Sequence, residues 1–357
     1  MEEKETEISR LGEFGLIDRL TRDIVLKNES TRTGVGDDAA IMYYGDNEVL
    51  VTTDLLLEGI HFDLRYVPLK HLGYKAAVVN FSDIYAMMGT PRQITVSLGI
   101  SSRFTTEHIE ALYSGIRLAC EKYGVDLVGG DTSASVTGLV ISITCLGDAK
   151  PGDAVKRSGA NPTDIICVSG DLGAAYMGLQ LLERENNVAA HSKDKNFQPD
   201  FSGREYILER QLKPEARRDI VAILREKGVA PTSMMDVSDG LSSELLHICR
   251  DSNVGCRVYE EKIPIDYQTA ITAEEMHISP LTAALNGGED YELLFTVPLT
   301  DHRKVEFING VREIGYITKP ELGCALVTPD GSEIRIHSRG WNAFEHEDGN
   351  ATPAPEK

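Results

Sequence analysis

The segment SMMDVSDGLSSELLHICR, residues 233–250, joins a predicted strand directly to a predicted helix. Its apolar first part, which ends at Val237, is typical of a buried strand, and Ser238 or Asp239 can cap the helix that follows. One apolar stripe at helical spacing is formed by Leu241, Leu245, Ile248 and Cys249. The segment therefore predicts a strand that brings two aspartates, Asp236 and Asp239, to the start of a helix.

The flanking segments predict a mixed fold. In the second half we expect strands at 164–169 and 291–297, helices at 172–184 and 214–227, and an exposed polar excursion at 185–203. In the first half we expect helices at 12–27, 68–88 and 106–123, and strands at 48–53, after Pro91, at 125–128 and at 138–146. The last two strands would flank a turn at Gly129-Gly130-Asp131. Because strands and helices alternate irregularly and some strands are adjacent, the pattern favours α+β over a doubly wound sheet.

The chain length of 357 residues favours two compact domains. We place the first at residues 1–149 and the second at 150–345. The stretch 346–357 is too polar to pack and is expected to be a disordered tail.

The composition excludes several classes of protein. A formal net charge of −20 disfavours binding to nucleic acid, and no apolar run is long enough to cross a membrane. The N-terminus, MEEKETEISR, is acidic where a signal peptide would be basic, so we expect a cytoplasmic protein. The six cysteines are dispersed without a C-x-x-C pair, which indicates reduced core residues.

Five short stretches end or turn on an aspartate, mostly beside glycine or after a strand. They are GVGDD (34–38), TTD (52–54), NFSD (80–83), GGD (129–131) and DVSDG (236–240). Each alone is a common turn or cap signal. If the five converge, like charges about 4 Å apart repel by about 4 kcal/mol at an effective dielectric near 20, so the carboxylates must protonate or hold a cation. An all-oxygen site suits Mg²⁺ or Ca²⁺, and of the two Mg²⁺ is the ion that commonly keeps waters and bridges substrate phosphates. The set therefore predicts phosphoryl transfer, although neither a Walker A sequence nor the protein-kinase motifs are present.

The motifs together resemble those of the thiamine-monophosphate kinase family, within the wider aminoimidazole-ribonucleotide synthetase superfamily. The resemblance extends from about residue 12 to 344, in the family's order. It is carried by GVGDDAA, TTD with His61 seven residues after Asp54, NFSD, GGDT, KRSGA, MDVSDGL, GGEDYELLF and the late GW.

This resemblance implies a two-domain, aminoimidazole-ribonucleotide synthetase-like α+β architecture. Its N-terminal α/β domain would bind ATP and metal and pair with its twin in a homodimer, and its C-terminal domain would be α+β. The implied reaction is direct in-line transfer of the γ-phosphate of ATP to thiamine monophosphate, with several Mg²⁺ ions and no phosphoenzyme. A requirement for a monovalent cation stays open.

The resemblance also assigns roles to individual residues. The implied metal ligands are Asp38, Thr52, Thr53, Asp54, Asp83, Asp131, Asp236 and Asp239. The implied nucleotide contacts are Gly130, Asp131, Arg157, Ser238 and Tyr113, and the implied thiamine contacts are His61, Glu289 and Trp341. Asp239, Arg157 and Asp131 would serve catalysis.

Simpler interpretations of single residues compete with these roles. Arg157 offers a planar fork of donors for phosphate, but it can equally be a surface arginine. Trp341, the only tryptophan, suits a cationic thiazolium ring, but core packing explains it as well. His61 can be a polar loop residue, and Glu289 can simply begin a strand.

Three sister families and one non-catalytic class remain as alternatives. Selenophosphate synthetase would show a reactive cysteine and lysine in a glycine-rich N-terminal segment, whereas this chain has no cysteine up to Arg32. The hydrogenase-maturation dehydratase would carry a C-terminal cysteine, whereas this chain ends ATPAPEK. Aminoimidazole-ribonucleotide synthetase is separated by GGEDYELLF followed by GW. A metal-stabilised binding protein would bind cations without turning over nucleotide.

Overall fold

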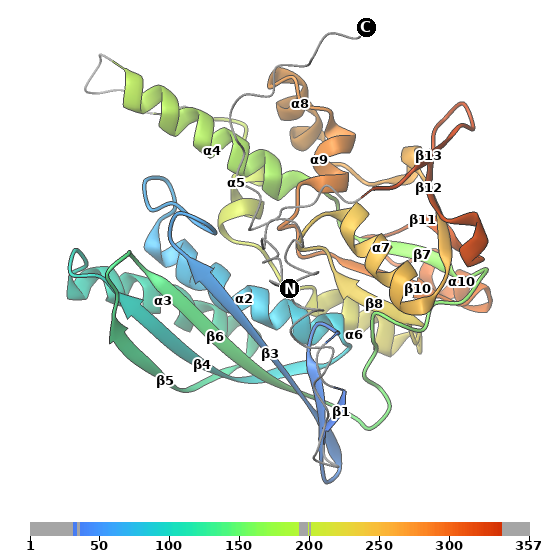
Figure 1. Ribbon diagram of the computed structural model, residues 1–357, viewed down its shortest axis with the longest axis horizontal. Helices are drawn as coiled ribbons and strands as arrows, with labels where there is room; N and C mark the ends of the chain where they lie inside the picture. The colour runs from blue at the N-terminus through green and yellow to red at the C-terminus, as the bar shows by residue number, and fades with distance from the viewer. Residues whose placement is uncertain (1–30, 34–35, 193–198, 200, 338–357) are drawn as a thin grey trace, which may run out of the picture.

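The computed structural model describes residues 31–33, 36–192, 199 and 201–337. The predicted helix 12–27, the proposed tail 346–357 and Trp341 lie outside these ranges. Within them the chain forms two sheets with helices packed on each, an α+β arrangement as predicted (Figure 1).

The first sheet has six strands in the order β1-β2-β3-β6-β4-β5. All neighbours are antiparallel except β4 and β5, which are parallel. The strands are β1 (Thr31–Thr33), β2 (Ala40–Tyr44), β3 (Asn47–Leu57), β4 (Thr90–Ile100), β5 (Asp126–Ala134) and β6 (Val140–Ala149). Helices α2 (Leu69–Ala86) and α3 (Thr106–Tyr123) lie side by side along one face of this sheet (Figure 1).

The second sheet has seven strands in the order β13-β12-β9-β11-β7-β10-β8, and only β12 and β9 are parallel. The strands are β7 (Ile165–Ser169), β8 (Ser233–Asp236), β9 (Gly255–Tyr259), β10 (Leu293–Val297), β11 (Val311–Thr318), β12 (Cys324–Val327) and β13 (Glu333–Arg335). Helix α7 (Leu241–Ser252) packs on it, contacting β8, β9 and β10.

The remaining helices fill the space around the second sheet. A helical group of α4 (Ala174–His191), α5 (Glu205–Leu212), α8 (Tyr267–Glu275) and α9 (Pro280–Asn286) packs together (Figure 1). The others are α6 (Arg218–Glu226), α10 (His302–Val305) and the short 3₁₀ helices η1 (Glu260–Lys262), η2 (Leu299–Asp301) and η3 (Pro320–Leu322). None of the helices in the described ranges is long and apolar enough to span a membrane.

The two halves share a core. The largest apolar cluster joins side chains under the first sheet, such as Phe81 and Ile94, to side chains of the second half, such as Ile220 and Phe295. Helix α2 also contacts β8 directly. The ends of the two sheets are therefore held in a fixed relation, which is what a site built from both halves requires.

Several sequence expectations were wrong in detail. Gly129-Gly130-Asp131 is not a turn but the middle of β5, and Asp54 lies inside β3 rather than at its end. Helix α4 continues into the first part of the expected polar excursion, as far as His191, and the helix expected at 214–227 begins only at Arg218. Backbone pairing with neighbouring strands overrides the local turn signal of paired glycines.

The packing of α2 on α3 depends on two glycines at the crossing point. A Cβ on Gly115 would lie 1.9 Å from the backbone oxygen of Lys70, and one on Gly73 would lie 2.0 Å from that of Leu112. Since backbone atoms cannot turn aside as a side chain can, the helices must separate to admit a methyl group.

We expect Gly115→Ala to lower the free energy of unfolding by about 2 kcal/mol or more. Arg117→Ala, on the exposed side of the same helix, should change it little. Chemical denaturation followed by circular dichroism measures both, and equal stability of the two variants would contradict the close-packed crossing.

Candidate active site

A cavity of about 1270 Å³ lies where the two halves meet. Its wall is built from β3, the loop that follows β3, α2, α4, the end of β8 and the segment before β10. Ligand pockets for drug-sized molecules occupy roughly 300–1,000 Å³, so this volume can hold more than one small ligand.

Three aspartates from separate parts of the chain meet on the cavity wall. Carboxylate oxygens of Asp38, Asp83 and Asp236 all lie within 4.8 Å of one another. Asp38 comes from the segment before β2, Asp83 from α2 and Asp236 from the end of β8. Asp54 also lines the cavity, so four of the five aspartate motifs reach it.

The hydrogen bonds of these carboxylates leave part of their capacity unused. The hydroxyl of Thr52 donates to Asp83 Oδ2 at 2.6 Å, and Ser82 donates to Asp236. Asp54 Oδ2 is buried and has no hydrogen-bond donor among the described residues. A buried carboxylate oxygen without a donor is costly, so a cation or bound water is the natural complement.

The electrostatics indicate the same need for positive charge. Burial raises the pKa of Asp54 to about 6, and burial together with Asp38 raises the pKa of Asp236 to about 7. Burial and the charges of Asp54 and Asp236 also raise the pKa of Asp83 well above its ordinary value. At neutral pH the cluster is therefore short of counter-charge.

This shortage predicts a pH-dependent stability of the metal-free protein. Because the pKa of Asp236 is higher folded than unfolded, its stabilising contribution is complete below about pH 4 and is lost as pH rises through about 7. We expect Asp236→Asn to gain about 2 kcal/mol relative to the unmodified chain between pH 5 and pH 8 in the presence of a chelator.

Urea denaturation at the two pH values measures this gain, with Asp153→Asn, at an exposed position, as the matched control. A stability difference that is the same at pH 5 and pH 8 would show that the cluster carries no unfavourable charge.

Arg157 forms an ion pair with Asp38, one of the three clustered aspartates. Its Nη2 and Nε donate to the two oxygens of Asp38 at 2.9 and 3.2 Å, and its backbone N–H donates to Asp37 at 2.6 Å. The guanidinium is mostly buried and lines the cavity, so it is not a surface arginine. Asp37, which the sequence analysis did not single out, therefore positions the Arg157 backbone.

The turn after β8 presents Ser238 and Asp239 to the cavity. Neither side chain caps α7, contrary to expectation, and the N-cap residue is Gly240. Instead, Oε1 of Glu244 accepts the backbone N–H groups of Ser238 and Asp239, at 3.1 and 2.8 Å. Glu244 was not among the predicted site residues. The sequence signal for it is its place in the first turn of the helix, four residues after Gly240, where an acidic side chain can accept backbone N–H groups.

His61 and Glu289 line the same cavity. Nδ1 of His61 accepts the backbone N–H of Leu57 at 3.0 Å, and burial lowers the pKa of the imidazole. Glu289 forms an ion pair with Lys75 at 2.8 Å and accepts from Gln211 at 2.9 Å. Lys75 and Gln211 lack any local motif, so the sequence could not identify them as cavity residues.

Of the remaining candidates in the described ranges, Thr53 reaches this cavity and Tyr113, Gly130 and Asp131 do not. Thr53 borders it, but its hydroxyl donates to the Ile143 oxygen on β6. Tyr113 is half-buried on α3, and Gly130 and Asp131 lie on β5, outside the cavity lining.

The strand register explains the separation of Asp131 from Asp54. Asp54 pairs across the sheet with Ile143, Val96 and Gly130 in turn, whereas Asp131 belongs to the next row, with Ser97, Ser142 and Leu55. Adjacent rows point to opposite faces of a sheet. Asp54 thus faces the helix-covered side, and Asp131 faces the side without helices.

Comparison with known proteins identifies the family. The chain matches the model of the AIR synthase related protein N-terminal domain at residues 36–149 and that of the C-terminal domain at 151–321. It is 33% identical over 343 residues to the thiamine-monophosphate kinase of Bacillus subtilis (strain 168), an alignment that covers 94% of this chain and 100% of that protein. The chain belongs to the thiamine-monophosphate kinase family.

Further members of the thiamine-monophosphate kinase family agree with this assignment. The Aquifex aeolicus (strain VF5) member is 34% identical over 337 residues, covering 94% of this chain and 99% of that protein. The solved structure of AaThiL complexed with AMPPCP and TMP superposes with a TM-score of 0.80 at 33% identity, covering 95% of this chain and 99% of that one. The predicted family, the aminoimidazole-ribonucleotide synthetase-like fold and the assignment as an enzyme of the kinase class are therefore confirmed.

Proposed function

We propose that this chain transfers the γ-phosphate of ATP to the phosphate of thiamine monophosphate, giving ADP and thiamine diphosphate. The observation that carries the proposal is the buried cluster of Asp38, Asp83 and Asp236 on the wall of a cavity large enough for two ligands. The names of the relatives and the AMPPCP and TMP complex of AaThiL support it.

The residues present fit Mg²⁺. Asp54 Oδ2 is a buried oxygen without a donor among the described residues, and the cluster offers only oxygen ligands, the kind that Mg²⁺ prefers. Asp38, Asp54, Asp83 and Asp236 would hold the ions, with Asp239 beside them. When bound, Mg²⁺ supplies neutralisation of the triphosphate charge.

The chain's own residues supply position and charge. Asp37 and Asp38 hold Arg157, which would bind a phosphate with its remaining donors. Glu244 fixes the turn at Ser238 and Asp239 that would contact the nucleotide. Because the acceptor is a phosphate oxygen that is already anionic near neutral pH, no strong general base is needed and no aspartyl-phosphate is expected.

The thiamine part of the substrate would lie near His61 and Glu289. The low pKa of His61 keeps the imidazole neutral, so it can act as a hydrogen-bonding group without repelling a cationic thiazolium. Lys75 and Gln211 hold the Glu289 carboxylate in place. Trp341 stays a proposed aromatic contact for the thiazolium, and a monovalent cation stays an open requirement.

We further propose a homodimer formed through the helix-free face of the first sheet. Strand β5 is exposed along all nine residues and ends the sheet, a position that proteins normally protect. Apart from Asp148 at one end, the adjoining face carries uncharged side chains from β3 and β6, namely Val49, Val51, Thr53, Leu55, Leu57, Val140, Ser142, Thr144 and Leu146. A second subunit on this face would cover it and give Gly130 and Asp131 access to a shared site.

The same proposal keeps residues 1–149 as the nucleotide-binding and dimerisation domain, 150–345 as the C-terminal domain and 346–357 as a tail. The proposed cytoplasmic location is supported by the six free cysteines.

The experiment that tests the function is a coupled assay of the purified chain with ATP, Mg²⁺ and thiamine monophosphate that follows ADP and thiamine diphosphate together. We expect equal amounts of both products, with none from unphosphorylated thiamine. Turnover of an aminoimidazole-pathway substrate instead would move the chain's activity to a sister family. Metal binding without any turnover would support the non-catalytic alternative.

A further inference from the structure

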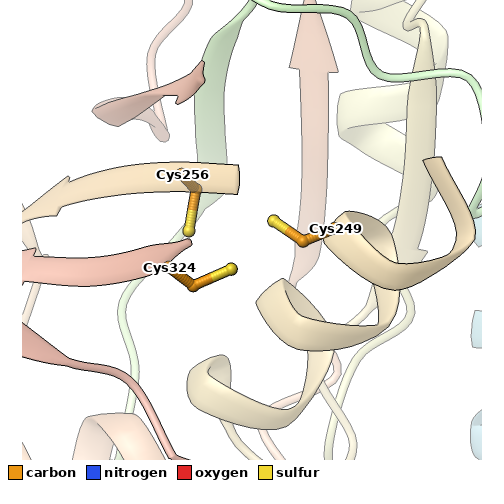
Figure 2. A group of neighbouring side chains, drawn as sticks. All are labelled: Cys249, Cys256 and Cys324. Atoms are coloured by element: carbon orange, nitrogen blue, oxygen red, sulfur yellow. The ribbon is translucent and has the colours of Figure 1, made fainter. Parts of the chain in front are cut away.

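Three cysteines that are far apart in the sequence meet in the C-terminal half, away from the aspartate cavity. The sulfur atoms of Cys249, Cys256 and Cys324 all lie within 4.8 Å of one another. Figure 2 shows the three side chains converging from α7, β9 and β12. The chain's other three cysteines, Cys120, Cys145 and Cys167, belong to the separate, larger apolar cluster.

The sheet register fixes two members of this group. Cys256 and Cys324 are direct partners in the parallel pair β9 and β12, so their side chains leave the same face of the sheet. In the same row Cys256 pairs with Ile317 of β11, and the N–H of Ile336 donates to the Cys324 oxygen. Both isoleucines are buried, so the cysteine pair has apolar side chains on either flank.

Helix α7 packs on this face of the sheet and supplies the third cysteine, Cys249. Cys249 is buried, as is Cys256, whereas Cys324 is half-buried. The group is thus closed on the helix side and partly open at Cys324. Such a geometry offers three sulfur ligands and one direction of approach.

A buried arginine fixes the backbone beside two of the cysteines. The guanidinium of Arg257, largely buried, donates to the backbone oxygens of Cys256, Gly323 and Leu322 at 2.9 to 3.1 Å. The same side chain forms an ion pair with Glu333 of β13 at 2.8 Å. Arg257 therefore holds in place the strands that carry Cys256 and Cys324.

We propose that Cys249, Cys256 and Cys324 form a binding site for a thiophilic metal ion of the Zn²⁺ class, distinct from the aspartate site. Sulfur atoms in a tetrahedral zinc site lie about 3.8 Å apart, given Zn–S bonds of about 2.3 Å, so small side-chain adjustments close the group around an ion. The fourth position would lie on the open side of the group, next to Cys324, and would take a water molecule. Binding converts three sulfurs to thiolates, so each thiol that is still protonated releases one proton, and no electron is transferred.

A bound ion would connect α7 to strands β9 and β12 of the second sheet. Helix α7 also carries Glu244, which holds the turn of Ser238 and Asp239. The ion would therefore stabilise the element that supports one wall of the cavity, without touching the reacting groups.

The test uses the full chain, reduced and stripped of metal, in excess Mg²⁺ so that the carboxylates are occupied. Native mass spectrometry after addition of Zn²⁺ should show one ion retained per chain, and Co²⁺ should give a thiolate-to-cobalt charge-transfer band. Zn²⁺ should also raise the melting temperature.

Cys324→Ala should lose the retained ion, the cobalt band and the Zn²⁺-dependent shift, while kinase turnover without Zn²⁺ is unchanged. Cys120→Ala, at a buried cysteine outside the group, should keep all three signals. Cys249→Ser provides a second variant if Cys324→Ala does not fold.

Three results would overturn the proposal. They are the absence of a thiolate band in the unmodified chain, Zn²⁺ retention that is equal in Cys324→Ala, or a disulfide between two of the three cysteines in place of metal binding. Each leaves the kinase proposal untouched, because that is decided by product formation with Mg²⁺ alone.

Discussion

Replacing Asp83 by asparagine is expected to lower kinase turnover by at least about 100-fold while making the metal-free protein more stable. The change removes one negative charge from a cluster in which Asp54 and Asp236 already raise the pKa of Asp83. The amide is nearly isosteric, and its oxygen can still accept the 2.6 Å hydrogen bond from Thr52.

The gain in stability follows from the sign of the pKa shift. A carboxyl group with a raised folded-state pKa costs free energy once the pH exceeds its unfolded value, and asparagine does not carry that cost. We expect the free energy of unfolding at pH 8, with a chelator present, to rise by about 1–2 kcal/mol. Saturating Mg²⁺ should reverse the order, because only the intact cluster gains from the ion.

The measurement pairs the coupled assay with urea denaturation in chelator and in Mg²⁺. Asp153→Asn, at an exposed position, is the control and should alter neither quantity. Near-full turnover in Asp83→Asn would remove this residue from the metal site. Loss of turnover with loss of stability would indicate a structural role only.

Asp239→Asn, at the cavity wall beside the cluster, should also lose most of its turnover and keep the fold.

Local patterns predicted those parts of the fold that depend on local structure. Helix α3 was expected at 106–123 and runs over Thr106–Tyr123, because its apolar spacing and its C-terminal glycine are both near neighbours in sequence. A strand was expected at 125–128 and found, but β5 runs on to Ala134 because Gly129-Gly130, which is typical of a turn, continues the strand. Position 130 requires glycine because β5 lies close to β4: a Cβ would lie 1.9 Å from the backbone oxygen of Val96.

The candidate site was predictable where a residue carries a motif. Asp38, Asp54, Asp83 and Asp236 stand in recognisable stretches and do converge. Lys75 and Gln211 act through the distant Glu289, and only the packing of α2 on α5 brings them together. The cysteine group shows the same limit, because Cys256 and Cys324 become neighbours only through the parallel pairing of β9 with β12.

The position of Asp131 leads to the second large effect. Within one subunit Asp131 and Asp54 point to opposite faces of the first sheet, so they cannot meet in one site. If both act on the same nucleotide, Asp131 must come from a partner subunit. Leu55 lies on Asp131's face with 52% of its surface exposed, at the centre of the proposed interface.

We expect Leu55→Glu to convert the dimer to monomers and to reduce turnover at least tenfold, because a buried unpaired charge opposes the interface. Leu118, 41% exposed on α3, provides the matched control, and Leu118→Glu should stay dimeric and active. Analytical ultracentrifugation measures the oligomeric state of each variant. An unmodified chain that is monomeric and fully active would refute the shared site.

Mixing two inactive variants tests the sharing of residues directly. Asp54→Asn and Asp131→Asn should each have little activity alone. If one site takes Asp54 from one subunit and Asp131 from the other, subunit exchange produces heterodimers in which one of the two sites is intact, and roughly a quarter of the unmodified turnover should return. If both residues serve the site of their own subunit, every site in the mixture carries one substitution and no activity returns. Recovery of turnover on mixing therefore distinguishes a site completed by the partner from one that each chain builds alone.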